Sequence, residues 1–513
     1  MLLFNKEYLF LLLSIIGCCY ANIADYLKGT TRSFNAIEGN VITVKIIMTN
    51  EQYDQMIEES QMSLLEFGMK YHGKLPEDLK YETKVGVNFT INDETQSFEN
   101  VRLKVGGNYG RTFSKLGFNL KLKKKQTFLG INNMRLRSDY MDVTHFRSKL
   151  AVDLLNKWDI PSIQETFCEL YVNDHYYGLY ILIDAIKPSW IKSHYDIPEE
   201  EEVKTLYDCG EIGDFTPENV LLCKNEEDEY LNYTEPLRDT FTKIYNLTSV
   251  KELSKYVDVE TARKSIISEY LFSSFDHFLV SGNNYHLYQQ SNGKWQILLH
   301  DFDTIFLSQF EGAIAKAQFD IQKHNDVLEY AKVKFDDWSV PGNRKPIVEV
   351  LYYHDQENFK KVLREMMVTG FNPDELFPRI DELAEFVAPY VQKDITPDAD
   401  GNYPGQVNTI GQINRYTMDM FWDATKYENI NGNIGLKKFI QTKFDAVCEH
   451  YKFDKNQLLT DAKIYRKKRA LNQSIDELKQ QIADLKEKLK TLFTEMIKEK
   501  IKKLTDQLNK LLE

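Results

Sequence analysis

An Asn-Gly pair between two apolar strands constrains the fold of this chain more than any other feature. The pair stands at 292–293, between apolar and aromatic runs at 285–290 and 294–299. This pattern is typical of a β-hairpin with a two-residue turn, because both turn positions need positive φ angles that Asn and Gly adopt easily. Counting outward from such a turn places Asn284 opposite Asp301.

Polar side chains are therefore expected to meet at the open end of this hairpin. Opposed residues share one face of a sheet, and Asp303 shares it too if the strand continues. Asp276 lies a short loop upstream. Protein kinases build their magnesium site in this way, from a catalytic Asp, a metal-binding Asn and a metal-binding Asp around a hairpin. The alternative is that these residues form only the polar end of a hairpin beside an acidic loop, with no catalytic or metal-binding role.

The composition indicates a folded, acidic protein. Of the 513 residues, 42% are hydrophobic and 13% aromatic, which is enough to build a large core. The net charge of −13 argues against nonspecific nucleic-acid binding, because there is no basic excess to displace counterions from phosphates. Much of the acidity lies in 196–235, which holds fourteen acidic residues and is expected to be a solvated loop.

Residues 1–21 are predicted to be a secretory signal peptide. Lys6 precedes an apolar run at 8–17, and cleavage is expected after Ala21. The run is short for a membrane span, and an uncleaved anchor is the alternative. No later transmembrane stretch is expected. The mature protein is therefore predicted to be secreted or to lie at the cell surface.

Glycosylation sequons and cysteines agree with the secretory pathway. The sequons begin at Asn88, Asn232, Asn246 and Asn472. After signal removal the chain keeps four cysteines: Cys168, Cys209, Cys223 and Cys448. The second and third flank part of the acidic segment, where a disulfide would fix a region with little core. Unpaired buried thiols are the alternative, and the spacing fits no zinc-site pattern.

Strands are expected first along the chain, and helices later. Strands are predicted at 41–48, 84–91, 98–106, 115–123, 169–172 and 177–184, and helices at 51–71 and after Asp142. From 250 onward helices dominate, interrupted by the hairpin. This order predicts an α+β fold after a lead-in at 22–39. Its parts are a β-rich N-terminal lobe at about 40–190, an acidic loop at 193–235 and a helical C-terminal lobe at about 240–452. The crevice between the lobes is the expected ligand site.

The segment 453–513 has the spacing of a coiled coil. Apolar residues recur in steps of four and three from Leu471 to Leu492, and the phase shifts before Leu504. Lys and Glu fill most other positions. The pattern predicts a long helix that associates with another copy of the chain, and folding back onto the lobes is the alternative.

Five segments in order share a pattern with a known family. They are VRLKVGGNYGRTFSKLGFNLKL at 101–122, LRSDYMDVTHFRSKLAVDLL at 136–155, YVNDHYYGLYILID at 171–184, the hairpin segment at 275–307, and GLKKFIQTKFDAVCEHY at 435–451. Together, over about 40–452, they resemble the spore-coat protein H (CotH) kinase family, which consists of secreted or surface atypical protein kinases of bacteria and fungi. The chain looks like a fungal-type member with an added coiled coil. The resemblance implies a two-lobe, kinase-like fold.

The resemblance also implies a reaction and roles for the hairpin residues. The expected reaction is transfer of the γ-phosphate of ATP to Ser or Thr of a protein substrate or a surface or coat protein. Asp276 would orient the attacking hydroxyl and accept its proton. Asn284 and Asp301 would hold Mg²⁺ or Mn²⁺ through hard oxygen ligands, with Asp303 as a further candidate.

Phosphate ligands are expected from the N-terminal lobe. Lys115 is the first basic candidate and Arg111 the second. The Gly-rich turn, with Gly107 and Asn108, could cover phosphates with its N–H groups, although such a cluster is also common in plain turns. Arg147 is expected to form a structural ion pair with Asp142 or Asp184.

The chain departs from the family pattern in places. The hydroxyl-bearing Gly-Asn-Ser-Ser of the family becomes Gly-Asn-Tyr-Gly at 107–110, and His300 stands where Trp is common. These changes keep open an alternative function, that of a catalytically weak or inactive kinase-fold adhesin or coat scaffold. The Met-Gly-Gln-Cys-Thr motif of adhesive relatives is absent.

Overall fold

The computed structural model describes residues 26–27, 34–76, 79–139, 141–210, 212, 214–309, 326–339, 346–430 and 432–512. The chain divides into two compact units, Met1–Leu458 and Leu459–Glu513. The predicted signal peptide at 1–21 and much of the predicted lead-in lie outside the described residues.

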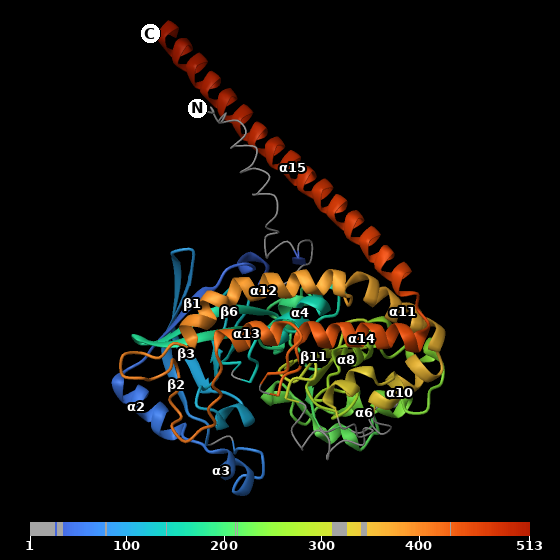
Figure 1. Ribbon diagram of the computed structural model, residues 1–513. Coiled ribbons are helices and arrows are strands. Elements are labelled where there is room, and N and C mark those ends of the chain that lie inside the picture. Colours follow the sequence, from blue (N-terminus) through green and yellow to red (C-terminus); the bar gives the residue numbers. More distant parts are fainter. Residues whose placement is uncertain are drawn as a thin grey trace, which may run out of the picture. The chain divides into compact units, whose positions relative to one another are not determined.

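In the described part of the first unit, seven strands close into a barrel (Figure 1). Their order is β1-β2-β3-β4-β5-β7-β6, and β6 runs parallel to β1. The strands are β1 Ile42–Ile47, β2 Glu82–Ile91, β3 Glu94–Val105, β4 Phe118–Lys121, β5 Asn133–Arg137, β6 Glu165–Val172 and β7 His175–Asp184. Apolar side chains that alternate along these strands form one buried cluster. The barrel is therefore a packed core.

Sequence patterns locate most of these elements but miss two details. The expected helix at 51–71 is two helices, α2 Asn50–Glu59 and α3 Leu64–Met69. Ser63 starts the second of them by accepting a hydrogen bond from the Glu66 amide. Strand β5 is not expected from the sequence, because its alternation covers only five residues.

The Asn-Gly hairpin belongs to a second sheet with strand order β11-β10-β8-β9. The strands are β8 Leu206–Cys209, β9 Cys223–Asn225, β10 Tyr285–Gln289 and β11 Trp295–Leu299. The prediction of a solvated loop at 193–235 is wrong for β8 and β9. Both strands come from that acidic segment, where Leu206 and Tyr207 are fully buried.

A disulfide joins Cys209 of β8 to Cys223 of β9, as one of the two sequence interpretations expects. Cys168 and Cys448 are buried free thiols in the part of the chain that the structure describes. The disulfide therefore fixes the two strands of the acidic segment to each other.

The hairpin turn holds three residues rather than two. Gln289 pairs with Trp295, and the Gly293 amide donates a 2.8 Å hydrogen bond to the Gln290 carbonyl. Gly293 has a φ of +81°. This is the hairpin in which a type I turn is followed by a residue in the left-handed region, which Gly adopts without strain.

The extra turn residue shifts the pairing of the hairpin by one position. Asn284 lies opposite His300, whose amide donates a 3.0 Å hydrogen bond to the Asn284 carbonyl. The predicted pairing of Asn284 with Asp301 is therefore wrong. Both Asn284 and Asp301 have positive φ angles, 57° and 65°, so the chain turns sharply on each side of the sheet edge.

The later part of the first unit is helical. Its longer helices are α6 Glu235–Ile244, α8 Val259–Phe272, α11 Gln356–Thr369, α12 Pro373–Asp394, α13 Met418–Thr425 and α14 Leu436–Tyr451, whereas α4 Arg147–Lys157 lies between the barrel strands β5 and β6. Shorter helices are α5 Pro188–His194, α7 Val250–Leu253 and α10 Phe335–Trp338. Helix α12 contacts α13, α14 and the barrel strand β7. The expected order, a β-rich N-terminal region followed by helices, is confirmed.

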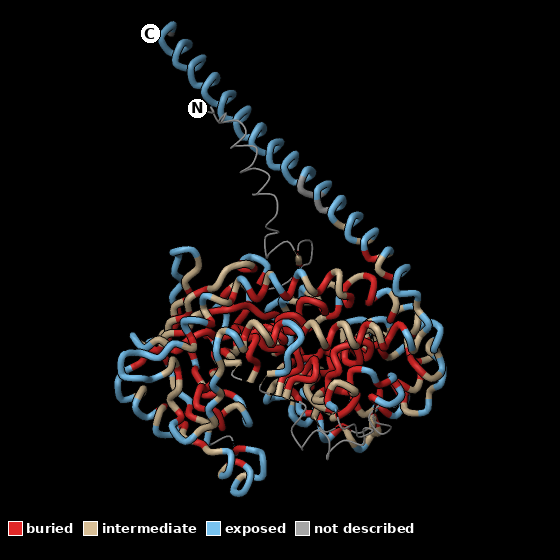
Figure 2. Tube along the Cα trace, in the orientation of Figure 1, coloured by how far each residue is buried: buried red, intermediate tan, exposed pale blue. Residues whose placement is uncertain are grey.

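The second unit is described as continuous helix, since α15 spans Lys455–Leu512. Apolar residues at the heptad positions from Leu471 onward are exposed, and Figure 2 shows most of the helix as exposed; Leu485 is 64% exposed and Leu489 66%. Across the described residues, no helix has both the length and the apolar character needed to cross a membrane.

Candidate active site

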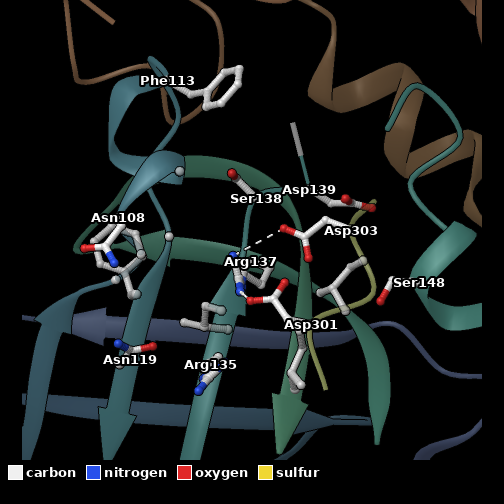
Figure 3. Close-up of a pocket in the computed structure, with 18 of the residues that line it drawn as sticks. Asn108, Phe113, Asn119, Arg135, Arg137, Ser138, Asp139, Ser148, Asp301 and Asp303 are labelled. Carbon is white, nitrogen blue, oxygen red and sulfur yellow. Dashed lines mark hydrogen bonds and ion pairs between the residues drawn. The ribbon is translucent and has the colours of Figure 1, made fainter. Parts of the chain in front are cut away.

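A cavity of about 420 Å³ lies where the barrel meets the end of β11. Its walls are the Gly-rich turn after β3, the strands β4, β5 and β7, and the acidic residues that follow β11. This volume is within the usual range for small-molecule sites. Figure 3 shows the polar side chains that line it.

Two arginines of β5 line one wall of the cavity. Arg135 and Arg137 are two residues apart on one strand, so they share a face, and Asn119 of β4 pairs with Arg135 in register. Guanidinium groups bind phosphate through paired N–H donors. Sequence reasoning does not find these arginines, because the only signal is the short alternation NMRLR.

Arg137 reaches two carboxylates on the opposite wall (Figure 3). It forms an ion pair with Asp301, and its Nη1 lies 3.5 Å from Asp303 Oδ2. The sequence predicts these two carboxylates as metal ligands, and the structure brings them to the same cavity.

The carboxylates that line this cavity have strongly shifted pKa values. Burial by itself raises the pKa of Asp301, but the Arg137 guanidinium, the hydrogen bond with Asp303 and the charge of Arg135 together hold that pKa well below its usual range. Burial and the charge of Asp301 raise the pKa of Asp303 well above its usual range. Burial also raises the pKa of Asp139, which lines the same cavity. A divalent cation would relieve this carboxylate repulsion, because it stabilises the ionised form of each group.

Asp276 is held by two amides. The Asn284 Nδ2 donates to the Asp276 carboxylate at 2.9 Å and to its carbonyl at 2.7 Å, and the Asn283 Nδ2 lies 3.4 Å from the other carboxylate oxygen. Burial and the charge of Asp301 raise the pKa of Asp276. Asn284 thus contacts Asp276 instead of pairing with Asp301 as predicted, and neither Asp276 nor Asn284 is among the described residues that line the cavity.

His277 links the Asp276 segment to the end of β11. Its Nε2 lies 2.9 Å from the His300 carbonyl, and its Nδ1 contacts the Ser274 hydroxyl. Burial lowers the pKa of His277 to about 4, so the ring is neutral near pH 7. The carbonyl can only accept, so Nε2–H donates to it and Nδ1 accepts from the hydroxyl. This bond positions the residue directly before Asp301.

The Gly-rich turn lies at the cavity. Gly107 and Asn108 both line it, and Gly107 has a φ of +79°, which a residue with a side chain rarely adopts. The structure therefore places these two predicted phosphate contacts in the same cavity as Arg135.

Lys115 is not brought to the cavity. Its side chain is 1% exposed, and its Nζ lies 2.5 Å from Asp394 Oδ1 and 3.1 Å from the Leu179 carbonyl. Gly178 makes room for this ion pair, because a Cβ there would stand 1.7 Å from the Asp394 oxygen. A buried, paired ammonium in this position cannot contact a phosphate in the cavity.

Arg111, the second basic candidate, is also placed elsewhere. Its guanidinium donates to the Leu79 carbonyl at 3.0 Å and to the Glu59 carbonyl at 3.2 Å, and the side chain is fully buried. Arg147 pairs with Asp142 at 3.2 Å, which is one of the structural pairs expected for it.

The model of the CotH kinase protein family matches residues 103–447, more than half of the chain. The chain belongs to the CotH kinase family. The match includes β5, the Gly-rich turn and the acidic residues after β11. Membership suggests a phosphotransferase of the protein-kinase type. No curated protein matches the chain.

Proposed function

We propose that this CotH kinase family member transfers the γ-phosphate of ATP to Ser or Thr hydroxyls of a protein, with a divalent metal ion. One observation carries the proposal: Asp301 and Asp303 line the same cavity as Arg135 and Arg137. Oxygen ligands for a hard cation and guanidinium donors for phosphates are the two groups that metal-dependent phosphoryl transfer needs.

The acidic group fits Mg²⁺ or Mn²⁺ by its chemistry. Its donors are carboxylate and amide oxygens, which these hard ions prefer. Asp301, Asp303 and the Oδ1 of Asn284 would hold the ion. When bound, it would neutralise charge on the phosphates and help to orient them.

Side chains and backbone N–H groups of the protein would accept the proton and bind the phosphates. Asp276, held by Asn283 and Asn284, would accept the proton of the substrate hydroxyl, and its raised pKa makes it a better base than an exposed aspartate. Arg135 makes no hydrogen bond or ion pair with other side chains among the described residues, so its guanidinium is available for a phosphate. The N–H groups at Gly107 and Asn108 could cover the same phosphates.

Replacing Arg135 by glutamine is expected to weaken ATP binding by about 10- to 100-fold, because one charge-assisted contact is lost. Calorimetric titration with ATP and Mg²⁺ measures this. Arg102→Gln, on β3 with a half-exposed side chain that pairs with Glu82, is the matched control and should bind ATP like the wild type. Equal ATP affinity in the Arg135 variant and the wild type would show that Arg135 does not bind the nucleotide.

Phosphate transfer itself tests the proposed function. Purified full-length protein, incubated with γ-labelled ATP and mixed protein substrates, should transfer label with Mg²⁺ or Mn²⁺ and not with a chelator. Asp276→Asn should lose transfer and keep nucleotide binding, because the amide cannot accept the proton. An absence of transfer with both metals would leave the kinase-fold scaffold or adhesin as the better account.

We also propose that the protein is secreted through the signal at 1–21 and that α15 pairs with a second copy of the chain. The exposed heptad positions of α15 support the second part, because a single long amphipathic helix is stabilised by burying its apolar seam.

Deleting residues 459–513 is expected to convert an oligomer into a monomer, as measured by size exclusion with light scattering. The double variant Leu485→Lys and Leu489→Lys should act in the same way, because it places charges in the seam. Glu487→Lys and Thr491→Lys, at positions away from the seam, serve as the control that also adds lysines. A monomeric wild type at micromolar concentration would contradict this pairing.

A further inference from the structure

Two histidines and a carboxylate converge on the second sheet. Asp208 of β8 pairs directly with His286 of β10, and His300 follows the end of β11. One ligand atom from each of the three lies within 4.8 Å of the others. The ring centroids of the two histidines are 4.7 Å apart.

Three of the four histidine ring nitrogens in this cluster lack a hydrogen-bond partner among the described residues. Both ring nitrogens of His300 and the Nδ1 of His286 are buried without a hydrogen bond among the described residues. The two residues are only 7% and 2% exposed. The His300 Nε2 lies 3.7 Å from the Asp208 Oδ1, which is too long for a hydrogen bond. Buried polar atoms without partners are rare in proteins, and an absent ion is one physical reason for them.

The surroundings prepare these nitrogens to act as ligands. The His286 Nε2 lies 2.8 Å from Glu226 Oε1, so a neutral ring donates its proton there and leaves the Nδ1 lone pair free. A carboxylate that orients a histidine in this way is typical of metal sites. The disulfide at Cys209 fixes the residue next to Asp208.

We propose that Asp208, His286 and His300 bind one Zn²⁺ ion, at a site separate from the oxygen ligands of the candidate active site. Two imidazoles and one carboxylate suit zinc and similar transition metals, whereas Mg²⁺ prefers oxygen ligands alone. Three protein ligands leave a coordination position open. Asp208 also lines the candidate active-site cavity, so the ion would lie near that cavity. The bound ion would hold His300 directly before Asp301 and so position that carboxylate.

Zinc titration of chelator-treated, full-length protein tests this proposal. The titration contains excess Mg²⁺ to fill oxygen-only sites, and no nucleotide. The wild type should bind one Zn²⁺ per chain, and the Co²⁺-substituted form should show the visible absorption of a cobalt ion with histidine ligands. His300→Phe and His286→Gln should each weaken binding by more than about 100-fold and lose that absorption. His354→Ala, which removes a half-exposed histidine elsewhere, should behave like the wild type.

Thermal melting separates loss of metal from loss of fold. His300→Phe replaces an unpaired polar ring by an apolar ring, so its metal-free melting temperature should equal or exceed that of the wild type. Only the rise on adding Zn²⁺ should disappear. The proposal is overturned if the wild type and His300→Phe bind Zn²⁺ equally, or if Mg²⁺ displaces the ion from the wild type. Neither result depends on phosphate transfer, so a failure here is distinct from a failure of the proposed kinase function.

Discussion

Replacing Lys115 by methionine is expected to lower the free energy of unfolding by about 3–5 kcal/mol, because it leaves a buried carboxylate without its cation. Lys115 and Asp394 are 1% and 5% exposed and lie 2.5 Å apart. Urea denaturation of the wild type and the variant measures the change. Lys393→Met is the control, because Lys393 is 48% exposed and its pair with Glu169 should contribute no more than about 1 kcal/mol.

A second variant shows whether the lost stability comes from the unpaired charge. Adding Asp394→Asn to Lys115→Met removes that charge and keeps an oxygen that can accept from the Leu179 amide, 2.8 Å away in the wild type. The double variant should therefore be more stable than Lys115→Met alone. If Lys115→Met kept the wild-type stability and lost ATP binding, Lys115 would be a phosphate ligand, as the family resemblance implies.

Asp301→Asn is expected to reduce metal-dependent phosphate transfer by at least about 100-fold, which is the order of effect seen when one transition-state contact is removed. The amide keeps the size of the side chain but loses the negative charge that attracts a cation and pairs with Arg137. Initial rates at several Mg²⁺ concentrations measure this loss, and it should not be recovered at high Mg²⁺.

Asp174→Asn is the matched control for this substitution. Its carboxylate is 97% exposed, in the turn between β6 and β7, and it pairs with Lys45 at the surface. It should keep the wild-type rate. Rates reduced equally by both substitutions, with unchanged melting temperatures, would contradict the role of Asp301.

The sequence predicts the hairpin and the gathering of acidic residues at its end, because these depend on local pattern. It does not predict the pairing register. Asn292-Gly293 suits both a two-residue turn and a three-residue turn with Gly in the left-handed position, and local propensity does not choose between them. Asp276 and Asn284 nevertheless meet, since a short connection joins them.

Long-range contacts explain the residues that sequence reasoning places wrongly or misses. The partner of Lys115 lies 279 positions away, so nothing local distinguishes this buried lysine from a phosphate ligand. Arg135 and Arg137 lie on a strand too short to show clear periodicity. The sequence pattern of β8 is difficult to recognise because acidic residues flank it, although Leu206 and Tyr207 are buried in the second sheet.

Calorimetric titration of ATP into the full-length protein, with Mg²⁺ and separately with a chelator, tests the central claim most directly. We expect the wild type to bind one ATP per chain with Mg²⁺, and we expect both the chelator and Asp301→Asn to weaken this binding strongly. Equal affinity with and without Mg²⁺, or no binding in either condition, would contradict a metal–nucleotide site at Asp301 and Asp303.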